Sequence, residues 1–309
     1  MDDSYQFVEI EGLKFAVHPD GDARGQDQGI IEEVVRDDCY LLKALAQASD
    51  GKDIRTIVDV GAHVGAFAVR AAAIWPNASI IAVEPNPEVA RLCMVSLEAN
   101  VQSKWEMVDA ALAYGCTELE LMTHAGGNFA SIALPAVAKE DMAALRHDPE
   151  RYQTSCRVRA ITLEDILQRY CPDGIDVLKL DCEGGEIGLF EHASDESLAQ
   201  VGRIIGEYHH GPGPVMKLIR RRLPRWNFAY LPITDQFGSF VATPIESDWP
   251  QAWLQAAVLW STERRAFLER QHSLRENLLD RVYRLQFRLG RLPLTRQLMA
   301  LRRWVKHRR

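Results

Sequence analysis

The sequence lacks any apolar run long enough to cross a membrane. Its longest apolar stretches, such as residues 252–260, are interrupted by polar side chains and fall far short of the roughly 18 consecutive apolar residues that suggest a membrane-spanning helix. The N-terminal sequence MDDSYQFVEIEG is acidic and has no apolar core, so we expect no secretory signal. We therefore predict a cytoplasmic protein, and the C-terminal region leaves open a peripheral contact with the inner face of the membrane.

Cysteine pairs at metal-binding spacing are also absent. No two cysteines form a CxxC motif, so a zinc site is not expected, and neither is a disulfide framework in a chain of 309 residues. Free cysteines are usually buried in folded proteins. We expect most of these thiols to be buried in a reducing compartment; they are Cys39, Cys93, Cys116, Cys156, Cys171 and Cys182.

A basic excess is missing from the chain as a whole. The net charge is −7, from 36 Lys and Arg against 43 Asp and Glu, whereas nucleic-acid-binding proteins usually carry a basic excess. The charge is nevertheless uneven. Residues 262–309 carry 14 basic and 4 acidic side chains, a net charge of +10, and the other 261 residues carry 22 and 39, a net charge of −17. We therefore predict an acidic body with a basic tail, and no nucleic-acid partner.

From residue 56 onward, short β-branched runs alternate with helical segments. The composition, 47% hydrophobic and 26% charged, is that of a folded globular protein, and the alternation indicates a parallel sheet with helices on both faces. We predict an α/β domain over residues 52–243, preceded by an N-terminal cap segment, residues 1–51, with a β-start at 7–17 and a helix at 29–48. Strands are expected at residues 56–60, 79–84, 105–112, 118–122, 156–161, 176–181, 201–208, 228–234 and 237–242. Helices are expected at residues 65–75, 87–100, 163–170 and 185–192, and a loop at 211–227.

Two segments depart from this alternation. Residues 124–153 are irregular apart from a helix expected at 136–146, and they either carry substrate contacts or form a solvated surface excursion. Residues 244–309 are predicted to be a basic amphipathic helical extension, because apolar side chains recur at spacings of three and four over residues 274–292. Three roles stay open for it: packing on the acidic body, binding to an anionic membrane, and homodimerisation or partner docking through residues 250–309.

The stretch IVDVGAHVGAF, residues 57–67, indicates a strand, a sharp turn at Gly61 and the start of a helix. Glycine suits a turn where the backbone bends sharply and approaches a ligand. A dinucleotide site would need the pattern GxGxxG, but Ala62 and His63 stand where the second glycine belongs, so no close approach for a pyrophosphate is provided. Asp59, near the end of this strand, instead suits a ligand that has no phosphates and carries a cationic, amino-acid-like part.

Two further strand ends carry acidic residues. Glu84 follows the next strand, 23 residues after Gly61, where such folds place a carboxylate that accepts hydrogen bonds from ribose hydroxyls. Asp109 ends the third strand, where its side chain would lie beside the base of a bound nucleoside. The three strand ends together predict a pocket for S-adenosylmethionine (SAM).

Several segments of the chain match one known family in content and in order. They are VDVGAHVGAF (58–67), AVEPNPEVARLC (82–93), Asn100, VDAAL (108–112), AITLEDIL (160–167), LKLDCEGGEIGLF (178–190) and IIGEYHH (204–210). The chain resembles the FkbM family of SAM-dependent methyltransferases over residues 38–243. The resemblance implies the seven-stranded, mostly parallel, Rossmann-like class I methyltransferase sheet with helices on both faces. Its usual activity is O-methylation of hydroxyl groups on sugars and polyketide-type natural products.

The cofactor contacts are expected in the turns that follow the first three strands. One departure from the family is His63, where Asn is more common, so the side chain that lines the methionine end of the cofactor stays open. The predicted SAM-binding residues are Asp59, Gly61, Ala62, His63, Gly65, Glu84, Pro85, Asn86, Asp109 and Ala110.

The methyl acceptor is expected at the ends of two later strands. The segment LKLDCEGGE places Asp181 at one strand end, and IGEYHHG places Glu207 and His209 at the end of the next, where open sheets bind their ligands. An attacking hydroxyl must lose its proton, and a positioned base contributes ~10²–10⁴-fold to the rate. We predict catalytic roles for His209, the first candidate for the base, for Asp181, the second, and for Glu207. The alternative is that His209 only begins a surface loop.

A metal ion is not expected, but one arrangement stays open. Asp181, Glu183 and Glu207 offer the oxygen ligands that hard divalent cations prefer, and an ion there could orient a sugar diol. Nothing in their spacing requires an ion. Glu183 and Glu186 are equally well explained as acids favoured at a helix N-terminus.

The function predicted from these motifs is SAM-dependent O-methylation. The acceptor would be a hydroxyl of a sugar, a glycan or a sugar-containing natural product. One alternative is an NAD(P)-dependent sugar-modifying oxidoreductase, which the missing second glycine disfavours. The other is a non-catalytic protein that docks on a membrane or a partner and retains a methyltransferase core.

Overall fold

The computed structural model describes residues 5–48, 53–124, 130–132, 152–209, 211–232 and 238–257. Its contacts divide the chain into two compact units, residues 1–257 and 258–309, and all described residues belong to the first unit. The helix expected at 136–146 and the basic tail beyond residue 257 therefore lie outside the described residues. Their predicted roles, like the predicted domain boundaries, stay predictions.

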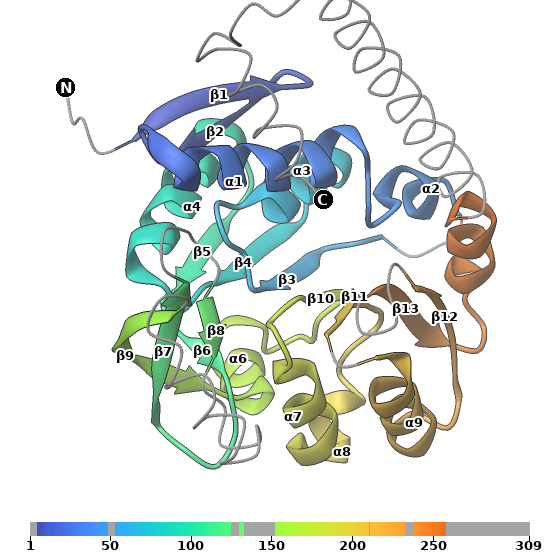
Figure 1. Cartoon of the computed structure of the whole chain (residues 1–309). Helices are drawn as coiled ribbons and strands as arrows, with labels where there is room; N and C mark the ends of the chain where they lie inside the picture. The colour runs from blue at the N-terminus through green and yellow to red at the C-terminus, as the bar shows by residue number, and fades with distance from the viewer. Residues whose placement is uncertain are drawn as a thin grey trace, which may run out of the picture. The chain divides into compact units, whose positions relative to one another are not determined.

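A seven-stranded sheet forms the centre of the first unit (Figure 1). Its strands run in the order β12-β13-β11-β10-β3-β4-β5, and all are parallel except β13, which is antiparallel to both neighbours. The bounds are β3 Thr56–Val60, β4 Ser79–Val83, β5 Trp105–Val108, β10 Val177–Leu180, β11 Ile204–Tyr208, β12 Trp226–Pro232 and β13 Gly238–Pro244. The predicted α/β fold with a mostly parallel seven-stranded sheet is confirmed.

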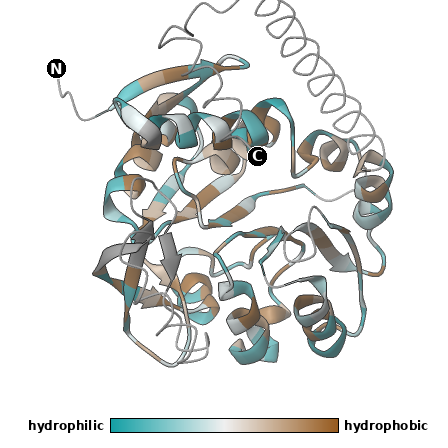
Figure 2. Ribbon diagram, viewed as in Figure 1, coloured by the Kyte–Doolittle hydropathy of each residue, from teal (hydrophilic) through white to brown (hydrophobic). Residues whose placement is uncertain are grey.

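Helices cover both faces of this sheet (Figure 1). The helices α3 and α4 lie on one side, and α6, α7 and α9 lie on the other. Figure 2 shows hydrophobic residues along the central strands and on the helix surfaces that face them. The bounds are α3 Ala66–Ile74, α4 Pro87–Asn100, α6 Leu163–Tyr170, α7 Gly185–His192, α8 Asp195–Leu198 and α9 Pro212–Arg222.

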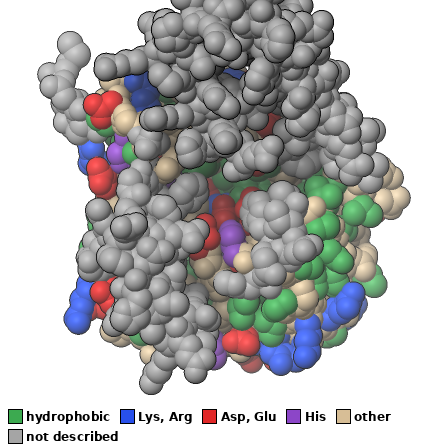
Figure 3. All heavy atoms as spheres, in the orientation of Figure 1, with side chains coloured by type: hydrophobic (Ala, Val, Ile, Leu, Met, Phe, Trp, Pro, Cys, Tyr) green, Lys and Arg blue, Asp and Glu red, His purple; other side chains and the backbone are tan. Residues whose placement is uncertain are grey.

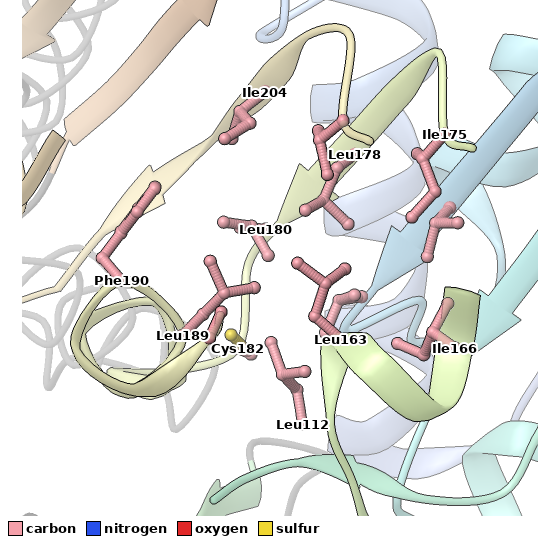
Figure 4. Packing of buried hydrophobic residues seen from close by; sticks show 14 of the residues in the cluster. Leu112, Leu163, Ile166, Ile175, Leu178, Leu180, Cys182, Leu189, Phe190 and Ile204 are labelled. Carbon is pink, nitrogen blue, oxygen red and sulfur yellow. The ribbon is translucent and has the colours of Figure 1, made fainter. Parts of the chain in front are cut away.

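Burial of the central strands explains their composition. The strands β3, β4 and β10 are buried over almost their whole length, as expected for parallel strands covered on both faces, which form continuous apolar runs rather than alternating ones. On the side of α6, α7 and α9, their side chains join a large apolar cluster. Figure 4 shows Leu178 and Leu180 from β10 beside Leu189 from α7 in this cluster.

The N-terminal region differs from the predicted single helix at 29–48. A hairpin, β1 Gln6–Ile10 and β2 Leu13–Val17, is followed by α1 Gly21–Ile31, the π-helix η1 Glu32–Arg36 and α2 Leu42–Gln47. The break before α2 has a local cause. Asp38 adopts a left-handed backbone conformation, and its carboxylate accepts hydrogen bonds from the backbone N–H groups of Leu42 (2.8 Å) and Lys43 (3.1 Å). Such side-chain bonds to the backbone compete with helix continuation and favour a new helix start.

The strand predicted at 105–112 is in fact two strands in different sheets. After β5 the chain bends, because Ala110 N–H donates to Val108 O at 3.0 Å, and β6 then pairs with β9 instead of extending the central sheet. The strand predicted at 156–161 is part of β9, so it also lies outside the central sheet. The second sheet has the order β6-β9-β7-β8, with β6 Ala111–Leu112, β7 Glu118–His124, β8 Ala130–Ile132 and β9 Tyr152–Ile161.

The segment predicted as a loop at 211–227 contains a helix. α9 begins with Pro212 in its first turn, where a missing N–H costs nothing, and its apolar side chains Val215, Met216, Leu218 and Ile219 are buried. The glycines and prolines at its start are more typical of turns and loops, although proline is accepted in the first turn of a helix. A further helical stretch at residues 249–257 ends the described part of the chain. Within the described residues, no helix has the length and apolar character needed to cross a bilayer.

Candidate active site

A cavity of about 420 Å³ lies at the carboxyl ends of the neighbouring strands β3, β4, β10 and β11. Its wall includes the turns at residues 60–63, 83–85 and 110–112, the segment 181–183, and side chains at the end of β11. Small-molecule sites typically measure roughly 300–1,000 Å³, and open α/β sheets bind ligands at these strand ends. Figure 3 shows acidic side chains beside a histidine at the centre of this face.

The turn after β3 depends on Gly61. Its φ angle of 75° is left-handed, and a Cβ atom at this position would overlap the backbone carbonyl of Asp181. The N–H groups of Gly61 and Ala62 donate to Val83 O at 2.9 and 3.0 Å, which fixes the turn on the neighbouring strand. Because Gly61 has no Cβ, the turn after β3 can lie close to the segment after β10. Both segments belong to motifs predicted from the sequence.

Glu84 is a buried carboxylate on the cavity wall. It is only 6% exposed, and its two oxygens accept hydrogen bonds from the backbone N–H groups of His63 and Asn86, both at 2.9 Å. Burial raises the pKa of Glu84 to about 7, and the two backbone bonds offset only part of that effect. The side chain is thus held in place and is poorly solvated, as a group that accepts hydrogen bonds from a ligand would be.

His63 also lines the cavity, in a left-handed backbone conformation. Burial lowers the pKa of its ring to about 4, so the imidazole is neutral near pH 7. Neither ring nitrogen has a hydrogen-bond partner among the described residues; Nε2 lies 3.6 Å from Asp27 Oδ1. A buried polar group in this state is costly unless a ligand or water completes its hydrogen bonds.

Asp59 lies beneath the cavity rather than on its wall. Its side chain is fully buried, and the Lys179 Nζ atom lies 3.0 Å from Asp59 Oδ1. Lys179 also donates to Gly61 O at 2.7 Å and lies 3.6 Å from Asp181 Oδ2. Burial alone would lower the pKa of Lys179, but the carboxylates of Asp59 and Asp181 outweigh it and raise that pKa above its usual range. Lys179, which lines the cavity, therefore lies between Asp59 and the ligand space.

The structure separates the remaining predicted cofactor residues into two groups. Ala62, Pro85 and Ala110 line the cavity, whereas Asp109 is exposed and is not part of its wall. Gly65 and Asn86 are likewise not part of the wall: Gly65 is the N-cap of α3, and Asn86 caps α4 by accepting from Glu88 N–H at 3.1 Å. The expected contact of Asp109 with a base stays a prediction.

The predicted catalytic residues meet at one end of the cavity. The ring of His209 lies within 4.0 Å of four carboxylates. Its Nδ1 is 2.7 Å from Glu186 Oε1, and its Nε2 is 3.5 Å from Asp181 Oδ1, 3.8 Å from Glu183 Oε2 and 4.0 Å from Glu207 Oε2. His210, which follows in the sequence, lies outside the described residues.

The charges in this cluster are set by their neighbours. Burial works against a charged imidazole, but the bond to Glu186 and the nearby carboxylates raise the pKa of His209 to about 10. Burial likewise raises the pKa of Glu207. For Asp181, Lys179 and His209 outweigh burial and lower the pKa. Without a ligand, His209 is therefore protonated and Asp181 is ionised at neutral pH.

The N-terminal segment that completes the cavity wall was not predicted from the sequence. Tyr40 donates its hydroxyl to Asp181 Oδ2 at 3.0 Å, and other residues from η1 and the following turn, among them Glu33 and Cys39, line the same wall. No motif marks these positions. Lys179, in contrast, had a detectable signal, because a lone charge inside the buried strand VLKL requires a partner.

The fold and the site together define the class of protein. The strand order, with antiparallel β13 between β11 and β12, and the cavity at the carboxyl ends of β3 and β4 are those of a class I methyltransferase. The sequence model described as "Methyltransferase FkbM domain" matches residues 59–230. The chain belongs to the FkbM methyltransferase family, as its motifs predicted.

Two curated relatives are similar over most of their own length. Methyltransferase sdnD of Sordaria araneosa is 24% identical over an alignment of 206 residues, and the match covers 58% of this chain and 74% of the relative. The 31-O-demethyl-FK506 methyltransferase FkbM of Streptomyces tacrolimicus is 26% identical over an alignment of 223 residues, and the match covers 63% of this chain and 79% of the relative.

Solved structures show a more distant likeness. The putative methyltransferase SMU.776, complexed with SAH, is 13% identical with a TM-score of 0.40, and the match covers 78% of this chain and 56% of that chain. The N-terminal domain of human METTL16, also in complex with SAH, is 12% identical with a TM-score of 0.37, over 71% of this chain and 68% of that one.

Proposed function

We propose that this protein is a SAM-dependent O-methyltransferase acting on a hydroxyl of a sugar, a glycan or a sugar-containing natural product. The observation that carries the proposal is Glu84, a buried carboxylate held by two backbone amides on the wall of a cavity of about 420 Å³. Membership of the FkbM family supports methyl transfer. A relative named for 31-O-demethyl-FK506 supports an oxygen atom as the acceptor.

The residues on the cavity wall fit SAM. Glu84 has the position and the acceptor atoms to bind ribose hydroxyls, and Ala110 offers an apolar surface for the adenine. The ring nitrogens of His63, which lack hydrogen-bond partners among the described residues, are available to the methionine part. No phosphate-binding glycine is needed for such a ligand, in agreement with the sequence at Ala62.

The acceptor hydroxyl would lie at the other end of the cavity. When bound, SAM supplies an electrophilic methyl group on a sulfonium ion. Asp181, Glu207 and His209 each bring one polar atom within 4.8 Å of the other two, and in this proposal they would surround the hydroxyl as it loses its proton. His209 can accept that proton only in its neutral form, and a nearby cation favours this form because it lowers the pKa of an imidazole. Binding of the cationic cofactor would therefore shift His209 toward the neutral form that can act as the base.

The acceptor wall suits a hydroxylated ring. Ile30, Val34 and Tyr40 contribute apolar surface, and Glu33 adds one carboxylate among them. Sugar rings have apolar faces and polar edges, so a mixed wall of this kind can bind both. The residues come from outside the segment that the family model matches, and we attribute the choice of acceptor to them.

A thermal-shift screen and a methyl-transfer assay test the proposal. We expect SAM and S-adenosylhomocysteine (SAH), but not NAD or NADP, to raise the melting temperature, and labelled methyl groups from SAM to appear on members of a glycan and macrolide panel. Glu84→Ala should lose both effects, whereas Glu98→Ala, which removes an exposed carboxylate on α4, should keep them. Stabilisation by NAD(P) instead of SAH would favour the oxidoreductase and contradict the proposal.

A further inference from the structure

We propose that Asp181, Glu207 and His209 form a binding site for a divalent cation, with Mn²⁺ as the ion that the site fits. Binding of the ion does not depend on the proposed methyl transfer, but its purpose rests on that function. One ligand atom from each residue lies within 4.8 Å of the other two. Asp181 follows β10, Glu207 lies near the end of β11, and His209 follows β11. Because β10 and β11 are paired neighbours, the sheet holds these two strand ends side by side.

The distances between the three residues are close to those of an octahedral site. Ligands about 2.1 Å from a six-coordinate ion lie roughly 3.0 Å apart in cis and 4.2 Å apart in trans. His209 Nε2 lies 3.5 Å from Asp181 Oδ1 and 4.0 Å from Glu207 Oε2. All three ligand atoms lie within 4.8 Å of one another, so small shifts of the side chains are needed to bring them onto one ion.

A second observation concerns the other ring nitrogen of His209. His209 Nδ1 lies 2.7 Å from Glu186 Oε1, and Glu186 is fully buried beneath the site. Metal-binding histidines almost always donate their second ring N–H to a carboxylate or a carbonyl, which fixes the ring and turns the free nitrogen to the ion. Glu186 is thus an outer partner of the kind that metal sites use, and it leaves Nε2 facing the cavity.

The balance of charge also favours a cation. Four carboxylates lie within 4.0 Å of one imidazole, and the ammonium group in reach of Asp181 is already paired with buried Asp59 at 3.0 Å. When all four carboxylates are ionised, one imidazolium does not neutralise this cluster. Buried charges are costly unless they are paired or bind a metal ion. A divalent cation would therefore compensate the negative charge that the described residues do not neutralise.

The donor set selects the kind of ion. Carboxylate oxygens suit Mg²⁺ and Mn²⁺, whereas imidazole nitrogen suits transition metals, and Mn²⁺ accepts both. The site differs from the alternative formed by Asp181, Glu183 and Glu207, because Glu183 is 45% exposed and does not join the three mutually close atoms. Three protein ligands leave coordination positions for water or for acceptor hydroxyls.

Such an ion would change the role of His209 from base to ligand. A hydroxyl bound to a divalent cation is more acidic than a free one, so the acceptor would not need a strong protein base. Glu183, whose carboxylate lies 3.8 Å from His209 Nε2 but is not a ligand of the proposed ion, would remain to take up the proton. The ion would also fix the acceptor oxygens close to the cofactor end of the cavity.

Titration of the full chain with Mn²⁺ alone tests the site. We would strip the protein with EDTA, saturate it with SAH and follow free Mn²⁺ by electron paramagnetic resonance. We expect one Mn²⁺ per chain, at least tenfold weaker binding in Glu207→Gln and in Asp181→Asn, and binding within threefold of wild type in Glu183→Gln. Glu191→Gln, an equal loss of charge at an exposed position on α7, is the matched control and should bind as wild type.

The outcomes separate the metal site from the proposed function. Wild-type protein that binds SAH but no Mn²⁺ at millimolar concentration overturns the metal site and leaves methyl transfer intact. Equal Mn²⁺ affinity in Glu207→Gln, Asp181→Asn and wild type overturns it as well. Failure to bind SAH would instead contradict the proposed function. If Glu207→Gln or Asp181→Asn loses its circular dichroism signal, the other of these two variants is used. The number of Mn²⁺ ions bound per wild-type chain shows by itself whether an ion binds.

Discussion

Replacement of Lys179 by methionine should destabilise the protein strongly. The lysine is 3% exposed in the middle of the sheet, and its ammonium group contacts Asp59 at 3.0 Å and Gly61 O at 2.7 Å. Methionine keeps much of the volume of the side chain but removes the charge. Loss of one partner of a buried ion pair costs about 3–5 kcal/mol, because the other charge stays buried without compensation.

The expected fall in melting temperature follows from this cost. At roughly 2–4 °C per kcal/mol for a domain of this size, 3 kcal/mol corresponds to about 6–12 °C. The assay is thermal unfolding followed by circular dichroism. Lys217→Met, at an exposed position on α9, is the matched control and should shift the midpoint by no more than about 2 °C.

A second substitution tests the cause. Burial raises the pKa of Asp59 even in the presence of Lys179, so the unpaired carboxylate should be the main source of the damage. Lys179→Met combined with Asp59→Asn removes this charge and should recover at least half of the lost stability. A midpoint for Lys179→Met within 2 °C of wild type would refute the reasoning, and so would a double variant no more stable than the single one.

Three further predictions concern the cofactor turn, its pH dependence and a helix start. Gly61→Ala should either prevent folding or abolish SAH binding, because the alanine Cβ would overlap the Asp181 carbonyl and the left-handed φ disfavours alanine. A folded variant with wild-type SAH affinity by calorimetry would contradict this. SAH binding should be about tenfold weaker at pH 6 than at pH 8, because burial raises the pKa of Glu84 to about 7 and only its ionised form accepts two ribose hydrogen bonds; Glu84→Gln should show little pH dependence over that range. Thr162→Ala should lower stability by about 0.5–2 kcal/mol, because Thr162 and Asp165 form a capping box; an unchanged urea midpoint would rule out that contribution.

Local signals explain which elements could be predicted from the sequence. Proline in the first turn of α4 and the capping box of α6 act within a few residues, and the predicted bounds of both helices agree with the structure. The turn at Gly61 and the carboxylate of Glu84 could be predicted for the same reason, because their motif lies within one strand and one turn.

Partners distant in the sequence could not be predicted in the same way. The pairing of β6 with β9 joins residues separated by about fifty positions and depends on long-range packing that no short pattern records. The contact of Tyr40 with Asp181 spans 141 positions, and nothing in the sequence around Tyr40 marks it. The same holds for Asp59, whose motif was recognised but whose actual partner, Lys179, lies on another strand.

The affinity of the full chain for SAH, in wild type and in Glu84→Ala, tests the central claim most directly. Isothermal titration calorimetry at pH 8 should give one SAH per chain with a dissociation constant in the range of roughly 1 μM to 1 mM that is usual for enzyme ligands. Glu84→Ala should show no measurable binding, and Glu98→Ala should bind as wild type. Undiminished SAH affinity in a folded Glu84→Ala variant would contradict the assignment of the cavity as the cofactor site.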